Sequence, residues 1–191
     1  MNAWTIHTSG GYGQKDLHNT PIHTMREVIM ERFKVVDSIS KSLDRGEATF
    51  IMTASPKGND YVYSVGLSVS TDNQFEIALT GLSPDQMHFF GNHFAKHLKE
   101  RVIELDEPIT YVEEVFNVPV ALVKVSQDCM LDGTFTVAET TLGMNDKQIP
   151  MFQLVLPDPN GRFPWQEGVD AKWKSYQSIF FDVAQFEKLY N

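Results

Sequence analysis

The chain has 191 residues with a single cysteine, and its 25 acidic and 16 basic residues give a net charge of −9. This length suits one domain whose core is large enough to fold without disulfides. The acidic balance argues against binding to duplex nucleic acid or to an anionic membrane surface, because both require basic patches. No run of about 18 apolar residues occurs, so no membrane-spanning helix is expected.

The first 22 residues are polar and rich in glycine, and they predict an extended N-terminal arm. The arm lacks the apolar segment of a secretory signal peptide. Together with the lone Cys129, this indicates a reducing compartment, and we expect a cytoplasmic protein. Residues 23–191 are expected to form one domain. The sequence is equally compatible with an arm that docks on this subunit or on a neighbouring one, which leaves a homo-oligomer open.

A helix and an antiparallel meander come next along the chain. Apolar residues recur at helical spacing over Thr24–Leu43, although Arg32 interrupts the stripe. Thr24 is expected to cap this helix, with Glu27 as its capping-box partner. Three strands should follow, the first two joined as a hairpin by a turn at residues 55–60. They are Thr49–Ala54, Tyr61–Ser70 and Phe75–Thr80.

The second half mixes helices and strands. Ser83 followed by proline and an acidic residue predicts the start of a helix that ends near Arg101. Strands are expected after it, with a short strand or helix within Asp132–Thr141. A terminal helix or a final strand completes the chain. The segments are Tyr111–Phe116 and Val120–Val125 for the strands, Trp173–Tyr190 for the helix and Phe180–Val183 for the alternative strand.

These elements predict a single α+β domain with a mainly antiparallel sheet of five or six strands and about three helices. We expect the helices to pack on one face of the sheet. The other face would then be available to a ligand or to a second subunit.

The most informative segment is Ile149–Asp170. It begins with an apolar strand at Met151–Leu156 and continues into a turn rich in proline, aspartate, asparagine and glycine. In the structural interpretation, Phe163 and Trp165 then pack into the core. In the functional interpretation, Asp158, Arg162 and Trp165 line a cleft for a planar or anionic ligand. Arg162 is expected to pair with Asp158 or to stack on Trp165.

Two motifs resemble one known family. The sequence PDPNGRFPWQEGVD at residues 157–170 resembles the C-terminal signature of the DUF4262 family. The segment Tyr63–Leu67, followed by Phe75–Leu82, resembles the other hallmark of that family. Here Ser64 stands in place of the usual threonine, and Phe75 in place of the usual proline. The resemblance spans about Val35–Asp170 and implies a fold unit without an activity, because the family has no known function.

Other residues could carry chemistry. His93 and His97 lie four residues apart and share a helix face, so they could supply two metal ligands, but a third would have to come from elsewhere. A solvated helix face explains them more simply. Glu76 is expected to be a hydrogen-bonded structural carboxylate. No Gly-x-Ser-x-Gly elbow surrounds Ser64, so a serine hydrolase is not indicated.

Two classes of function follow. The first is a non-catalytic binding protein that holds a partner protein or a small planar or anionic ligand, such as a nucleotide, in a cleft. The second is a hydrolase assisted by a metal at His93 and His97, or by Asp158 acting on a water. No cofactor is assigned. The expected ligand-binding residues of the first class are Tyr63, Ser64, Gly66, Asp158, Arg162 and Trp165.

Overall fold

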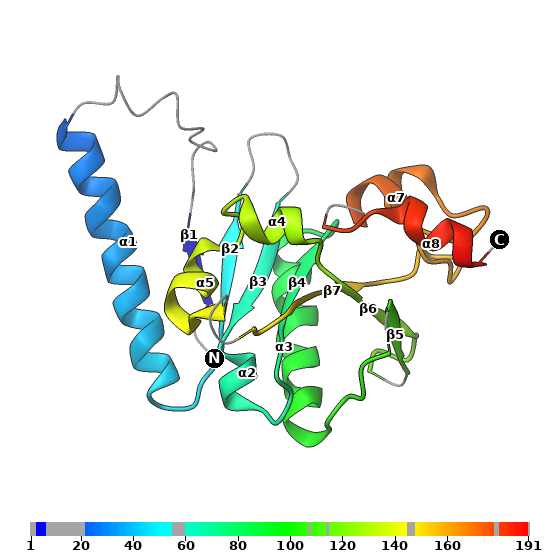
Figure 1. Ribbon diagram of the computed structural model, residues 1–191, viewed down its shortest axis with the longest axis horizontal. Coiled ribbons are helices and arrows are strands. Elements are labelled where there is room, and N and C mark those ends of the chain that lie inside the picture. Colours follow the sequence, from blue (N-terminus) through cyan, green and yellow to red (C-terminus); the bar gives the residue numbers. More distant parts are fainter. Residues whose placement is uncertain are drawn as a thin grey trace.

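The computed structural model describes residues 3–6, 22–54, 60–106, 108–113, 115–144, 148–177 and 180–190, with side chains described between residues 33 and 188. These residues form an α+β domain built on one sheet (Figure 1). The predicted class and the mainly antiparallel sheet are therefore confirmed. The sheet has seven strands, one more than the upper expected number, because part of the N-terminal arm joins it.

The strand order is β1-β2-β3-β4-β7-β6-β5. The predicted meander β2-β3-β4 is antiparallel, as is the group β5-β6-β7. Parallel pairing of β4 with β7 joins these two halves, and β1 pairs in parallel with β2 at one edge. The bounds are Ala3–Ile6 (β1), Thr49–Thr53 (β2), Tyr61–Val65 (β3), Glu76–Thr80 (β4), Ile109–Val112 (β5), Val120–Lys124 (β6) and Met151–Val155 (β7).

Seven helices occur in the described part of the chain. They are Ile22–Leu43 (α1), Leu67–Ser70 (α2), Pro84–Glu100 (α3), Gln127–Leu131 (α4), Thr136–Leu142 (α5), Ala171–Gln177 (α7) and Val183–Tyr190 (α8). Helix α3 has the predicted start, with a capping box between Ser83 and Gln86 and Pro84 in the first turn. Helix α1 begins two residues before Thr24, which therefore lies inside the helix rather than at its cap.

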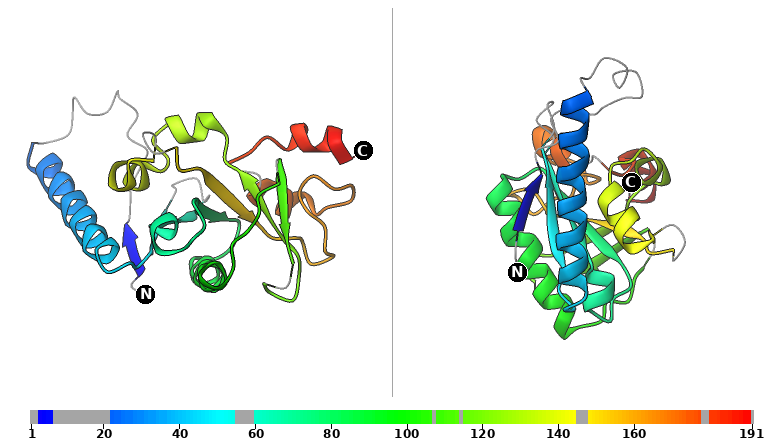
Figure 2. Two further views of the ribbon diagram at one scale, coloured as in Figure 1. Left: turned by 60° about the horizontal axis from the view of Figure 1, so that its bottom comes forward. Right: turned by 90° about the vertical axis from the view of Figure 1, so that its left-hand side faces the viewer.

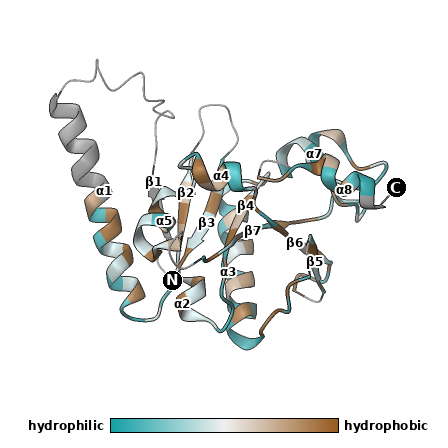
Figure 3. Ribbon diagram, viewed as in Figure 1, coloured by the Kyte–Doolittle hydropathy of each residue, from teal (hydrophilic) through white to brown (hydrophobic). Residues whose placement is uncertain are grey.

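Helices cover both faces of the sheet, so the expectation of one free face is wrong (Figure 2). On one face, α3 packs against a cluster that includes Phe50, Val62 and Phe152. On the other, α1 and α5 cover Ile51 and Tyr63. The central strands are buried along nearly their whole length and strongly apolar (Figure 3). Apolar residues on both faces require cover on both faces.

The predicted terminal helix is two helices. Phe180 and Phe181 lie between α7 and α8 and are buried against the sheet, at 3% and 7% exposure. A straight helix from Trp173 onward would carry these two rings in different directions, whereas an interrupted chain buries both. Helix α8 then packs Phe186 on the β6-β7 half of the sheet.

Two predicted strands end earlier than expected. Residues 115–118 follow β5 as bends rather than as strand, so the strand expected at Tyr111–Phe116 lies instead at Ile109–Val112. The strand expected at Tyr61–Ser70 stops at Val65, because Gly66 adopts φ +102 and the chain turns into α2. The hairpin turn expected at 55–60 falls largely on residues 55–59, outside the described residues.

Replacing Gly66 by alanine should lower the free energy of unfolding by about 2–3 kcal/mol. A Cβ there would place a side chain in the positive-φ region, and it would meet Leu43 Cδ2 at 2.2 Å, so the end of the Leu43 side chain would have to shift. The matched control is Gly46→Ala, since Gly46 has φ +69 and open space around its Cβ, and it should cost only about 1–2 kcal/mol. Urea unfolding measures both variants, and equal costs would contradict a contact effect at Gly66.

Candidate functional site

The carboxylate of Glu76 is fully buried and accepts five hydrogen bonds. The hydroxyl groups of Ser64 and Ser68 each donate at 2.6 Å. The backbone N–H groups of Gly66, Leu67 and Ser68 donate at 3.0–3.1 Å. Burial raises the pKa of Glu76, and these donors act in the opposite sense. The interpretation of Glu76 as a satisfied structural carboxylate is confirmed.

This arrangement explains the motif that surrounds Gly66. Ser64 is fully buried, and its hydroxyl also accepts from the N–H of Ile77, so its hydrogen bonds are made inside the domain. Gly66 supplies the left-handed turn that points three consecutive N–H groups at one carboxylate. Tyr63 is 2% exposed and packs against Tyr61 and Phe135. All three residues therefore lie in the interior, where their contacts stabilise the fold.

Asp158 closes the loop that follows β7. Its carboxylate accepts from the N–H groups of Asn160 and Arg162 near the start of the loop and from that of Asp170 at its end. These backbone donors hold the pKa of Asp158 below its usual range, and burial acts in the opposite sense. Because the pKa of this carboxyl group is lower in the folded protein than in the unfolded chain, its ionised form stabilises the fold. That stabilisation is fully present when the pH is above the pKa of the unfolded chain, and it is lost as the pH falls through the pKa of the folded protein.

Arg162 and Trp165 take separate roles in this loop. The guanidinium of Arg162 is exposed and donates to the carbonyl of Gly168 at 2.6 Å. Among the described residues, neither the expected ion pair with Asp158 nor stacking on Trp165 is formed. Trp165 is 1% exposed, stacks on Phe163 at 5.1 Å and donates from Nε1 to the hydroxyl of Tyr111. The structural interpretation of this corner is confirmed.

The two groups of expected ligand residues belong to different core clusters. Tyr63 belongs to the cluster beneath α1 and α5, whereas Trp165 belongs to the cluster beneath α8. Gln153 of β7 lies between the two groups on the same sheet face and is fully buried. It donates to Gln177 O and accepts from the N–H of Phe180. These hydrogen bonds form a polar bridge inside the core, which separates the two groups of expected ligand residues.

The histidines lie along α3. His93 Nε2 is 3.1 Å from the carbonyl of Val115, and its ring lies near Phe89 and Phe116. The ring of His97 stacks on Phe94 at 6.2 Å. Within the part of the chain that the structure describes, no group of three or more His, Cys, Asp or Glu side chains is placed to hold a metal ion.

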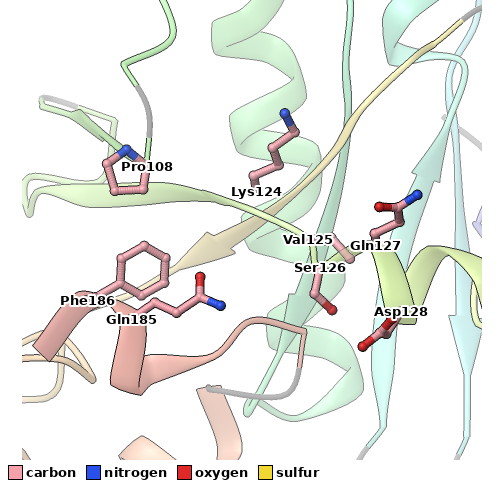
Figure 4. Close-up of a pocket in the computed structure, with 8 residues that line it drawn as sticks. All are labelled: Pro108, Lys124, Val125, Ser126, Gln127, Asp128, Gln185 and Phe186. Carbon is pink, nitrogen blue, oxygen red and sulfur yellow. The ribbon is translucent and has the colours of Figure 1, made fainter. Parts of the chain in front are cut away.

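A pocket of about 420 Å³ opens elsewhere, between the end of β6 and α8 (Figure 4). The side chains of Ser126, Asp128, Gln185 and Phe186 point into this space, whereas that of Lys124 extends away from it. Ser126 also caps α4 through the N–H of Cys129. The lining residues are Pro108, Lys124, Val125, Ser126, Gln127, Asp128, Gln185 and Phe186.

The pocket is connected through its aromatic wall to the loop at residues 158–170, here called the corner loop. The ring of Phe186 lies 5.8 Å from that of Trp165 and 5.7 Å from that of Phe181. Trp165 therefore supports this wall from the interior. None of the pocket residues is among the site residues expected from the sequence. Ser126 and Asp128 carry the sequence signal of a helix start, and nothing in the sequence places Gln185 beside them.

The described residues form a small α+β domain with a surface pocket between β6 and α8. The chain belongs to the family described as Domain of unknown function (DUF4262), which it matches over residues 44–170. No curated protein and no solved structure matches the chain. None of the helices searched among the described residues has the length and apolar character needed to cross a membrane.

Replacing Glu76 by glutamine should lower the free energy of unfolding by about 3 kcal/mol or more, or roughly 6–12 °C in Tm. The amide would place an NH₂ group against donors that have no other acceptor. Glu104→Gln, at an exposed glutamate, is the control and should leave Tm unchanged. Calorimetry of both variants makes the comparison, and a Glu76→Gln protein as stable as the wild type would contradict this account.

Replacing Asp158 by alanine should loosen the corner loop. Amide hydrogen exchange at Asn160, Arg162 and Asp170 is expected to accelerate by about tenfold or more, because all three N–H groups lose their acceptor. The exposed Asp72→Ala provides the control. Unchanged exchange in Asp158→Ala would show that other contacts hold the loop.

Proposed function

We propose that the chain is a non-catalytic binding protein that holds a small planar molecule in the pocket between β6 and α8. One observation carries the proposal: a ring and three hydrogen-bonding side chains converge on one space. Its volume of about 420 Å³ falls within the range of small-molecule sites. Phe186, which is 5% exposed, contributes apolar lining, and Ser126, Asp128 and Gln185 offer donors and acceptors.

The charges favour an uncharged ligand over an anionic one. Asp128 brings a carboxylate to the pocket, and the ammonium group of Lys124 points away from it (Figure 4). A negatively charged group would be repelled by Asp128 without compensation from a cation. A planar ring with both donors and acceptors, such as a nucleobase, suits the lining best. In the sequence, Arg162 indicated an anionic ligand, and the charges of this pocket do not favour one.

The proposal also includes the cellular compartment in which the protein acts. Cys129 is a free thiol, half-buried against the cluster beneath α1 and α5. A free thiol is typical of a reducing compartment and supports action in the cytoplasm. A partner protein is the alternative occupant of the same surface, to which α4 contributes Gln127 and Asp128 and α8 contributes Gln185 and Phe186.

Titration with adenosine, followed by amide NMR shifts, tests the proposal. The amide signals of Ser126, Gln127 and Gln185 should move on binding. Gln185→Ala should weaken adenosine binding by about fivefold to tenfold, as expected for one lost hydrogen bond. Adenosine monophosphate should bind no more tightly than adenosine, because its phosphate approaches Asp128.

The control is Gln74→Ala, which removes an exposed glutamine from a segment before β4, and it should bind adenosine like the wild type. If the amide signals that move belong to the loop around Arg162, the binding site lies at that loop instead. The absence of any shift with adenosine, adenosine monophosphate and free nucleobases would overturn the small-molecule proposal and favour a protein partner.

A further inference from the structure

The three polar side chains that point into the pocket between β6 and α8 differ in what they offer a ligand (Figure 4). The hydroxyl oxygen of Ser126 already accepts from the N–H of Cys129 at 3.4 Å, which leaves its O–H group to donate. The backbone N–H of Ser126 donates to the carbonyl of Phe180 at 2.9 Å and is therefore used within the fold. The amide of Gln185 carries both a donor and an acceptor, whereas the ionised carboxylate of Asp128 can accept but cannot donate.

The carboxylate of Asp128 is available to a ligand. Asp128 lies in the first turn of α4, is exposed, and directs its side chain into the pocket (Figure 4). In the residues that the structure describes, neither a hydrogen-bond donor nor a cation contacts this carboxylate. A planar carboxylate with two unoccupied oxygens is best matched by two parallel N–H groups on one edge of a ligand.

We propose that Asp128 makes this pocket selective for a ring edge on which a ring N–H group lies between an exocyclic amino group and a carbonyl oxygen. The inference rests on the proposed function and specifies the class of ligand for the same site. Guanine and pterins both carry such an edge. The ring N–H and the amino group would donate to the two oxygens of Asp128, and the carbonyl oxygen would accept from a donor of Ser126 or Gln185.

Adenine presents a different edge to the same carboxylate. Its amino group can donate to one oxygen of Asp128, but the adjacent ring nitrogen is an acceptor and would face the other oxygen. Two acceptors that face one another make no hydrogen bond, so each loses its contact with water without gaining a partner. Because Asp128 is exposed and water still reaches it, we expect a preference for guanosine over adenosine of only about tenfold.

Titration of the 191-residue chain with guanosine, adenosine, xanthosine and biopterin, followed by amide NMR shifts, tests the inference. Xanthosine has a carbonyl oxygen in place of the amino group of guanosine, so the wild type should bind it at least about tenfold more weakly than guanosine. Asp128→Asn should reverse this order, because the new amide accepts from the ring N–H and donates to that oxygen. General damage to the fold would not produce a gain in xanthosine binding. Biopterin, which carries the guanine edge on another ring system, distinguishes the two sources of that edge.

The matched control is Asp72→Asn, which removes the same charge from an exposed position between α2 and β4 and should bind all four compounds like the wild type. If guanosine and adenosine bind this pocket equally well, or if Asp128→Asn leaves the order of guanosine and xanthosine unchanged, the inference is wrong while the proposed function stands. If none of the four compounds shifts the amide signals around the pocket, both the inference and the proposed function are wrong.

Discussion

The buried carboxylate of Glu76 is the interaction on which the centre of the fold depends. Glu76 begins β4, and its carboxylate accepts from Ser64 near the end of β3 and from residues 66–68, where the chain turns into α2. A buried carboxylate without partners would be strongly unfavourable, so the turn has to present its N–H groups inward. This requirement accounts for glycine at residue 66 and for serine at both 64 and 68. Residues that suggested a ligand site in the sequence thus have a structural explanation.

A second carboxylate organises the other half of the domain in the same manner. Asp158 binds backbone N–H groups from both ends of its loop and so fixes the path of residues 158–170. That path buries Trp165 beside Phe181 and Phe186. The family match ends at residue 170, yet the core continues into α7 and α8. The C-terminal helices therefore complete the domain and also supply one wall of the pocket.

The sequence predicted the fold better than the site, for physical reasons. Strong local signals, such as Ser83 followed by Pro84 or the apolar runs of β6 and β7, specify single elements and were interpreted correctly. The strand expected at Tyr61–Ser70 failed because the long-range bonds of Glu76 override local β propensity. The pocket could not be predicted, because Ser126 and Gln185 are 59 positions apart and meet only through the packing of Phe180 and Phe181.

The additions at the two ends of the family domain differ in how they are held. At the C-terminus, Gln177 donates to Thr80 O and accepts from the N–H of Leu156, and Trp173 donates to Leu156 O. Polar groups buried in this way define one position for α7, because each would be costly without its partner. In the described part of α1, Val35, Ile39 and Leu43 make apolar contacts with the core, and apolar contacts specify position less strictly. The hydrogen bonds of α7 thus fix the C-terminal part of the core, whose last helix, α8, lines the pocket with Gln185 and Phe186.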